Sequence, residues 1–171
     1  MLPKLVITDI DGVWTDGGMY YDQQGNEWKK FNTSDSAGVL FLRLLNIPLV
    51  IMTGEDTAMV QRRAEKLRIE HVYQGVRDKL TVAQNLCAEM NIDLQDVAFM
   101  GDDLGDMPLL RKVGYSACPS NSPDYVKSIT HLTTNKAGGD GAFREFVEHI
   151  LKSNHRLDEI LEQHERSLYC S

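Results

Sequence analysis

A cluster of acidic residues has the spacing that metal chemistry requires. Asp102, Asp103 and Asp106 follow the apolar run Val97–Met100, so three carboxylates lie within five residues at the end of a predicted strand. Carboxylates placed this closely repel one another unless a cation lies between them. Oxygen ligands of this kind select a hard divalent ion, Mg²⁺ before Zn²⁺. The alternative is an acidic cluster that only caps a helix.

A second pair of carboxylates follows another apolar run. Asp9 and Asp11 come directly after Leu5–Thr8 and lead into Gly12. Residues two apart on a strand point to the same side, so both carboxylates can face one crevice beyond the strand end. This pair alone is equally compatible with an acidic turn that ends a strand.

Three further residues could bind an anion. Thr53 and Gly54 follow the run Leu49–Met52, and Lys79 begins a predicted helix. A hydroxyl and a flexible backbone can hold a phosphate oxygen, and a lysine at a helix N-terminus opposes the helix dipole unless an anion lies nearby. Taken singly, a helix-capping threonine and a solvated lysine are the simpler interpretations. The four motifs together, in this order, are far more specific than any one of them.

The elements that must position these residues alternate between strands and helices. Continuous apolar runs are typical of strands covered on both faces of a parallel sheet, and apolar residues at helical spacing lie between them. This alternation predicts right-handed βαβ units, and therefore an α/β fold with a Rossmann-like parallel sheet flanked by helices. The predicted strands are Leu5–Thr8, Leu49–Met52, Val97–Met100 and Tyr115–Cys118, and the predicted helices span residues 56–67, 79–90 and 141–152.

Two segments depart from this alternation. Residues 18–31 read as two strands around a Gly25-Asn26 turn, a β-hairpin inserted after the first strand. Residues 153–171 carry apolar residues at helical spacing among charges and are expected to form a C-terminal helical tail that ends near Cys170. The main domain is therefore expected to cover residues 1–152. The glycine-rich stretch 138–141 could bind an anion with Arg144, or could simply end the last strand.

Composition excludes several classes of protein. The 171 residues carry a formal charge of −7, which argues against a nucleic-acid binder. No apolar run approaches the length needed to span a membrane, and the N-terminus does not resemble a signal peptide. Three scattered cysteines suit reduced thiols better than a disulfide framework. We therefore expect a cytoplasmic protein with no nucleic-acid or membrane partner.

With all four motifs in order from Asp9 to Asp106, the sequence resembles the haloacid dehalogenase superfamily of phosphotransferases. The resemblance implies a Mg²⁺-dependent phosphohydrolase that passes through an aspartyl-phosphate. Asp9 would be the nucleophile, and Asp11 would protonate the leaving alkoxide and then activate the hydrolytic water.

The same resemblance assigns the residues around the phosphate. The metal would be held by Asp9, the backbone carbonyl of Asp11 and Asp102, supported by Asp103 and Asp106. The phosphoryl oxygens would be bound by Thr53, Gly54 and Lys79. A divalent cation and a lysine can neutralise the charge that redistributes when a carboxylate attacks a phosphate dianion.

No cap domain fits between these motifs, because 41 residues separate Asp11 from Thr53 and 25 separate Thr53 from Lys79. Over nearly its whole length the sequence resembles the capless, tetrameric phosphatases that act on 8- and 9-phosphates of 2-keto-3-deoxy sugar acids. This resemblance is carried by residues 9–17, the hairpin, residues 73–75, Lys79, residues 101–103 and residues 138–145. It implies a homotetramer in which the hairpins assemble the subunits and neighbouring subunits complete each pocket.

Two substrates compete within that subgroup. Octulosonate 8-phosphate (KDO 8-phosphate) phosphatases typically have Arg-Asp-Gly-x-Gly after the hairpin and Arg after Thr-Gly, whereas this chain has residues 33–38 (TSDSAG) and Glu55. Both departures resemble the branch that hydrolyses 2-keto-3-deoxy-nononate (KDN) 9-phosphate, or an N-acylneuraminate 9-phosphate, and that substrate is preferred. In that branch the residues matching Glu55, Arg63 and Lys66 would contact the sugar acid. Charge compensation at a helix start for Glu55, and a solvated helix face for the two cations, are the simpler alternatives.

A phosphoacceptor signalling domain of the receiver type also combines an acceptor aspartate, an acidic pair, a threonine and a lysine around Mg²⁺. Such domains lack a second aspartate two residues after the acceptor. Asp11, the long hairpin and the order of the motifs therefore favour the enzyme.

Overall fold

The computed structural model describes residues 1–169 of the chain, with side chains described through Arg166. Six parallel strands form one sheet in the order β5-β4-β1-β6-β7-β8, with β1 at its centre. The strands are β1 (Leu5–Thr8), β4 (Leu49–Met52), β5 (His71–Tyr73), β6 (Val97–Met100), β7 (Tyr115–Cys118) and β8 (Leu132–Thr133). The four predicted strands are confirmed with their bounds, and the α/β fold with a parallel sheet is confirmed. The short edge strand β8 was not predicted.

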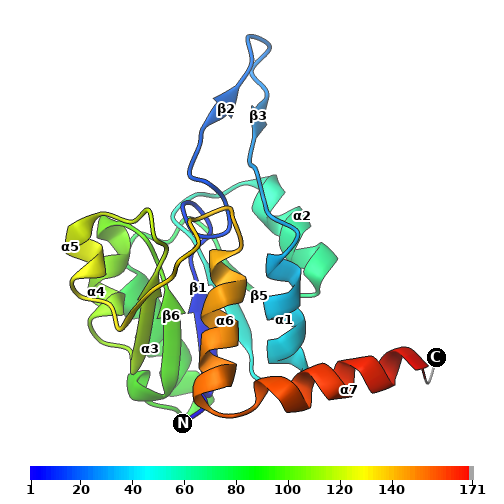
Figure 1. The fold of residues 1–171 in the computed structure, drawn as a ribbon. Coiled ribbons are helices and arrows are strands. Elements are labelled where there is room, and N and C mark those ends of the chain that lie inside the picture. The colour runs from blue at the N-terminus through cyan, green and yellow to red at the C-terminus, as the bar shows by residue number, and fades with distance from the viewer. Residues whose placement is uncertain (170–171) are drawn as a thin grey trace.

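Helices cover both faces of the sheet (Figure 1). One core cluster lies between the sheet and α1, α2, α6 and α7, and the other lies between the sheet and α3, α4 and α5. Alternate residues of β1 serve both clusters, because Val6 faces the first and Leu5 and Ile7 face the second. The helices are α1 (Asp35–Leu44), α2 (Ala58–Leu67), α3 (Lys79–Met90), α4 (Met107–Leu110), α5 (Asp124–Lys127), α6 (Ala142–Ser153) and α7 (Leu157–Tyr169).

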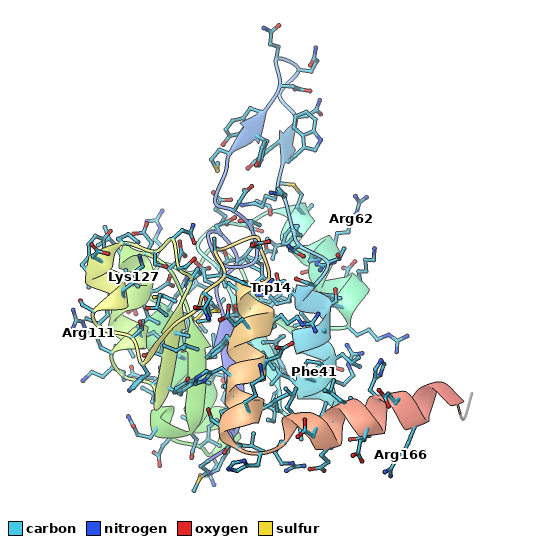
Figure 2. All side chains as sticks on the ribbon, viewed as in Figure 1. Trp14, Phe41, Arg62, Arg111, Lys127 and Arg166 are labelled. Atoms are coloured by element: carbon cyan, nitrogen blue, oxygen red, sulfur yellow. The ribbon has the colours of Figure 1, made fainter. Side chains whose placement is uncertain are left out.

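The chain leaves β1 through a tight turn that follows Asp9. The backbone N–H groups of Val13, Trp14 and Thr15 all donate to the carbonyl of Ile10. Trp14, which is 1% exposed, packs on a phenylalanine of α6 with ring centroids 4.7 Å apart (Figure 2). Its indole N–H donates to the Thr8 hydroxyl at 3.0 Å. A large buried aromatic residue therefore anchors the turn that carries the residues after β1.

The predicted hairpin is present and projects away from the body of the protein (Figure 1). Its strands β2 (Tyr20–Tyr21) and β3 (Glu27–Trp28) pair antiparallel. A bridge between Thr15 and Phe31 closes its base. Large apolar side chains on it remain exposed, namely Met19, Tyr20, Tyr21 and Trp28. Each keeps between 43% and 63% of its surface exposed in the described part of the chain.

The expected helical tail forms α7, which lies at the end of the molecule opposite the hairpin (Figure 1). Ile160 anchors it in the first core cluster and is fully buried. Cys170 and the side chain of Leu168 lie outside the described residues. Among the described residues, no helix is both long and apolar enough to cross a membrane.

Candidate active site

The predicted motifs meet in one cavity of about 510 Å³ at the carboxyl ends of the strands. The strand order reverses beside β1, so the loops after β1 and β6 diverge and leave a crevice between them. Nine predicted residues line this cavity: Asp9, Asp11, Thr53, Gly54, Glu55, Lys79, Asp102, Asp103 and Asp106. The sheet therefore brings together segments that lie almost 100 residues apart in the chain.

Lys79 connects the two acidic motifs. Its Nζ lies 2.9 Å from Asp9 Oδ1 and 2.5 Å from Asp106 Oδ1, and its side chain is 6% exposed. Burial disfavours the charged form, but the two carboxylates outweigh this effect and raise the pKa of the ammonium above its ordinary value. Because Asp78 caps α3 by accepting the N–H of Thr81, Lys79 lies in the first turn and points back toward β1. The simpler interpretation of a solvated lysine is wrong.

Asp106 is held in place by the backbone that precedes it. Its Oδ2 accepts the N–H groups of Asp102 at 2.9 Å and Asp103 at 3.2 Å. A Cβ on Gly101 would lie 2.5 Å from the Asp106 carboxyl carbon, so this folded-back position requires a glycine there. Asp103 is itself exposed and accepts a hydrogen bond from Tyr125 at 3.3 Å. The four residues form a small rigid turn after β6.

The carboxylates of Asp9, Asp102 and Asp106 fit a divalent cation. One oxygen of each lies within 4.8 Å of the others. Burial, together with the charge of Asp106, raises the pKa of Asp9 to about 7. Burial, together with the charges of Asp9 and Asp106, raises the pKa of Asp102 to about 8. Such a cluster of oxygen donors carries more negative charge than Lys79 alone compensates, which suits Mg²⁺.

Thr53 and Gly54 follow β4 on the other side of β1. Thr53 is 1% exposed, and its backbone N–H donates to the carbonyl of Tyr73 at 2.9 Å. The N-terminus of α2 is capped by Thr57, whose hydroxyl accepts the N–H of Val60. The helix-capping interpretation of Thr53 is therefore wrong, and Thr53 lines the cavity.

Asp11 has a partner that the sequence did not predict. Lys29, the residue after β3, places its Nζ 2.5 Å from Asp11 Oδ1 and 2.5 Å from Glu55 Oε2. Burial disfavours the charged form of Lys29, whereas the hydrogen bonds to both carboxylates favour it, and its pKa is raised. The other Asp11 oxygen, Oδ2, is buried without a hydrogen-bond partner. No spacing rule pointed to Lys29, because it reaches Asp11 and Glu55 only once the hairpin returns the chain to the end of the sheet.

Arg63 and Lys66 do not line the cavity of the single chain. Arg63 turns toward α1, where its guanidinium donates to the Asn32 carbonyl at 3.1 Å and the Ser36 hydroxyl at 3.2 Å. It also lies over the Phe31 ring at 5.8 Å. Lys66 is exposed on the last turn of α2. Their predicted contact with the sugar acid, partly across a subunit interface, stays a prediction.

The glycine stretch 138–141 packs against the loop after β1. A Cβ on Gly138 would lie 1.8 Å from the Gly12 carbonyl oxygen, and Arg144 forms an ion pair with Glu148 at 2.7 Å. Close packing of the backbone therefore explains why glycines occur in this stretch, without a role in binding an anion. A residue that the sequence reasoning missed is Arg77, an exposed cation that lines the cavity.

Comparison with known proteins shows which family the chain belongs to. Residues 63–146 match the family described as haloacid dehalogenase-like hydrolase. The 3-deoxy-D-manno-octulosonate 8-phosphate phosphatase KdsC of Yersinia pestis is 37% identical over 155 residues, which are 91% of this chain and 83% of the relative. The chain belongs to the haloacid dehalogenase-like hydrolases. The expected class of enzyme, a phosphoric monoester hydrolase, is confirmed with this membership.

Solved structures of other haloacid dehalogenase-like proteins agree. A probable YrbI family phosphatase from Pseudomonas syringae pv. phaseolica has a TM-score of 0.89 and 40% identity, over 99% of this chain and 93% of that one. The 3-deoxy-D-manno-octulosonate 8-phosphate phosphatase of Moraxella catarrhalis has a TM-score of 0.90 and 37% identity, over 94% and 92%. That structure contains a magnesium ion, a phosphate ion and a KDO molecule.

These relatives bear on the preferred substrate. The two relatives whose names state a substrate are both named 3-deoxy-D-manno-octulosonate 8-phosphate phosphatase. The preference for the nonulosonate branch, which rested on residues 33–38 and Glu55, is not supported. The octulosonate alternative fits the comparisons better, because similarity over nine-tenths of the chain outweighs differences at a few pocket positions.

Proposed function

We propose that the protein is a Mg²⁺-dependent phosphatase that hydrolyses the 8-phosphate of 3-deoxy-D-manno-octulosonate. The observation that carries this proposal is the position of Lys79, which is buried between Asp9 and Asp106 at the carboxyl end of the central strand β1. A nucleophilic carboxylate beside a fixed cation and a second acidic cluster is the arrangement that phosphoryl transfer needs. The octulosonate phosphatases among its relatives supply the substrate class.

The chain's own residues account for both halves of the reaction. A carboxylate oxygen of Asp9 forms a bond to phosphorus while the bond from phosphorus to the sugar oxygen breaks. Asp11 gives its proton to the departing alkoxide. Asp11 then takes a proton from a water molecule, whose oxygen attacks phosphorus and releases Asp9 and inorganic phosphate.

The remaining residues hold the phosphoryl group. Thr53 and Gly54 face it from the end of β4, and Lys79 faces it from α3. Asp9, Asp102 and Asp106 would hold Mg²⁺, which supplies positive charge that offsets the charge moving between attacking and leaving oxygens. Asp106 also fixes Lys79, so the same carboxylate contributes to the metal site and to the phosphate site.

A second candidate substrate is a nonulosonate 9-phosphate. Glu55 lines the cavity and is held by Lys29, where octulosonate phosphatases typically have an arginine. A carboxylate there accepts hydrogen bonds from sugar hydroxyls and repels a substrate carboxylate. This single position favours a longer polyol chain near Glu55.

We also propose that the working form is a homotetramer in the cytoplasm. The support for assembly is the hairpin, whose Met19, Tyr21 and Trp28 are each at least half exposed. Apolar side chains gathered on one projecting element are typical of a contact with another subunit. Cys87 and Cys118 are buried free thiols, which suits a reducing compartment.

The test is a comparison of kcat/KM on octulosonate 8-phosphate, a nonulosonate 9-phosphate and a hexose 6-phosphate. We expect a sugar-acid phosphate to be preferred over the hexose phosphate by at least about 100-fold, since the pocket must recognise a carboxylate that the hexose lacks. EDTA should abolish activity and added Mg²⁺ restore it. Equal activity on all three substrates would contradict the sugar-acid proposal, and activity insensitive to EDTA would contradict the metal.

A further inference from the structure

The side chain of Lys29 is buried although most of its hairpin is exposed. Its side chain is 3% exposed, while its neighbour Lys30 is 66% exposed. Removing an ammonium from water is costly unless charged partners replace the water. Lys29 has two such partners, Asp11 and Glu55, which come from the loops after β1 and β4. Three segments of the chain therefore converge on one cation beside the cavity.

The contact with Lys29 gives the two oxygens of the Asp11 carboxylate different surroundings. Oδ1 receives Lys29 at 2.5 Å and the hydroxyl of Thr15 at 3.4 Å. Oδ2 has no hydrogen-bond partner although it is buried, and Asp11 lines the cavity. A carboxyl group with one oxygen fixed by a cation carries its proton on the other oxygen and cannot rotate freely about its χ2 torsion.

Glu55 balances this arrangement. Without Glu55, Asp11 would be the only carboxylate in contact with the Lys29 ammonium, and Nζ would be held from one side only. With it, Lys29 is held from two sides, so Nζ is fixed in the direction of Oδ1. Glu55 therefore has a role within the chain in addition to any contact with a sugar hydroxyl.

We propose that Lys29 is a positioning residue for Asp11: it anchors Oδ1, with Glu55 as its counter-ion, so that Oδ2 is presented to the oxygen of the leaving group. This inference rests on the proposed phosphatase reaction. In that reaction the proton on Oδ2 moves to the sugar oxygen as the phosphorus–oxygen bond breaks. Lys29 keeps its own protons throughout and touches no substrate atom.

The leaving group provides the test, because a sugar alkoxide needs the proton and a nitrophenolate does not. Lys29→Met removes the charge and keeps the length of the side chain. We expect its kcat for the sugar-acid phosphate to fall about 10- to 100-fold, with KM within about 3-fold, since general acids contribute about 10²–10⁴. With p-nitrophenyl phosphate, the rate of p-nitrophenol release in the first turnover should change less than about 3-fold, because that step needs no proton, whereas the later attack of water, which also uses Asp11, is common to both substrates. Lys29→Arg, which keeps the charge, should recover part of the loss.

Two variants serve as references. Lys30→Met removes the neighbouring exposed lysine, whose ammonium lies 3.6 Å from Asp16, and should match the wild type on both substrates. Asp11→Asn should show the same dependence of the first-turnover rate on the leaving group as Lys29→Met, more strongly. If Lys29→Met does not fold, as judged by circular dichroism, Glu55→Gln should show a weaker form of the same pattern.

Three results would overturn the inference: an unchanged kcat on the sugar-acid phosphate, equal losses of the first-turnover rate on both substrates, or a change confined to KM. Failure of the proposed function is recognised separately. In that case the wild type releases no phosphate from either ester, or Asp11→Asn shows no dependence on the leaving group.

Discussion

At the scale of single residues, Asp9 illustrates how a group can destabilise the fold and still be needed. It is buried beside Asp106, and burial together with that charge raises its pKa to about 7. Lys79 offsets part of this cost through a contact at 2.9 Å. Natural proteins tolerate such repulsion where chemistry requires it.

Asp9→Asn should therefore separate chemistry from folding. The amide cannot attack phosphorus, so phosphate release should fall by at least about 10³-fold. The uncharged side chain also removes repulsion with Asp106, while Lys79 keeps its contact with that residue. We expect a Tm in metal-free buffer equal to or above that of the wild type, measured by thermal denaturation. Substantial turnover by the variant would remove Asp9 as the nucleophile.

Asp35 offers a pH-dependent prediction away from the metal cluster. Its side chain is fully buried, Oδ1 accepts the N–H of Arg144 at 3.0 Å, and Oδ2 has no partner. Burial raises its pKa from 3.8 to about 6, which the nearby cations reduce only in part. The folded state therefore binds this proton more tightly than the unfolded state. Its stabilising contribution is present below about pH 4 and is lost as the pH rises to about 6.

Asp35→Asn removes this titration and keeps the acceptor for Arg144. The difference in unfolding free energy between variant and wild type should shift in favour of the variant by about 2 kcal/mol from pH 4 to pH 6. Urea unfolding at a series of pH values measures it, and other carboxylates cancel in the comparison. A difference that stays constant across that range would contradict the assignment.

At the scale of elements, most of the fold but only part of the candidate site could be predicted from the sequence. The central strands were predictable because neighbouring residues such as Leu5 and Val6 are buried on opposite faces of the sheet, which gives continuous apolar runs. The edge strand β8 has two residues, one of them exposed, and leaves no such run. Cavity residues that directly follow strands, such as Asp9 and Thr53, were predictable for the same reason.

Residues that reach the site across space were not predictable. Lys29 arrives 18 residues after Asp11 by way of the hairpin, and Arg77 lines the cavity from the loop before α3. Neither has a spacing that marks it, since their positions depend on how loops fold over the sheet. Arg63, in contrast, carried a suggestive charge but turns toward α1.

The turn after β1 gives a prediction for the metal site. Gly12 has φ +82°, and a Cβ there would lie 1.9 Å from Asp102 Oδ2. Gly12→Ala should therefore displace the Asp102 carboxylate and raise the Mg²⁺ concentration for half-maximal activity by at least about tenfold, as changes around metal ligands commonly do. Titration of phosphate release with Mg²⁺ measures it.

Gly25→Ala is the matched control for this variant. Gly25 has a similar φ of +83°, but a Cβ there would meet nothing within 4 Å. It carries the same backbone penalty, about 1–2 kcal/mol, without the collision. Its Mg²⁺ dependence should equal that of the wild type. An equal shift in both variants would show that backbone strain, and not displacement of Asp102, changes the metal affinity.

At the scale of the whole molecule, the hairpin connects the proposed subunit contact with the candidate active site. Its outer part exposes Tyr21 and Trp28, and its base carries Lys29, which contacts Asp11 and Glu55. A two-stranded hairpin alone is marginally stable in water. Burial of its apolar side chains against another subunit would therefore also order the residue that positions Asp11.

This link predicts that assembly and catalysis fall together. In the double variant Tyr21→Ser, Trp28→Ser we expect a monomer by sedimentation velocity, where the wild type should be a tetramer, because two large apolar contacts are lost from each subunit. We expect kcat on the sugar-acid phosphate to drop by about tenfold or more, since a looser hairpin holds Lys29 less firmly. Leu161→Ser, on α7 at the opposite end of the molecule, removes an exposed apolar residue without touching the hairpin and should leave both properties unchanged (Figure 1). A wild type that sediments as a fully active monomer would contradict the assembly, and a monomeric double variant with full kcat would break the link between the hairpin and Asp11.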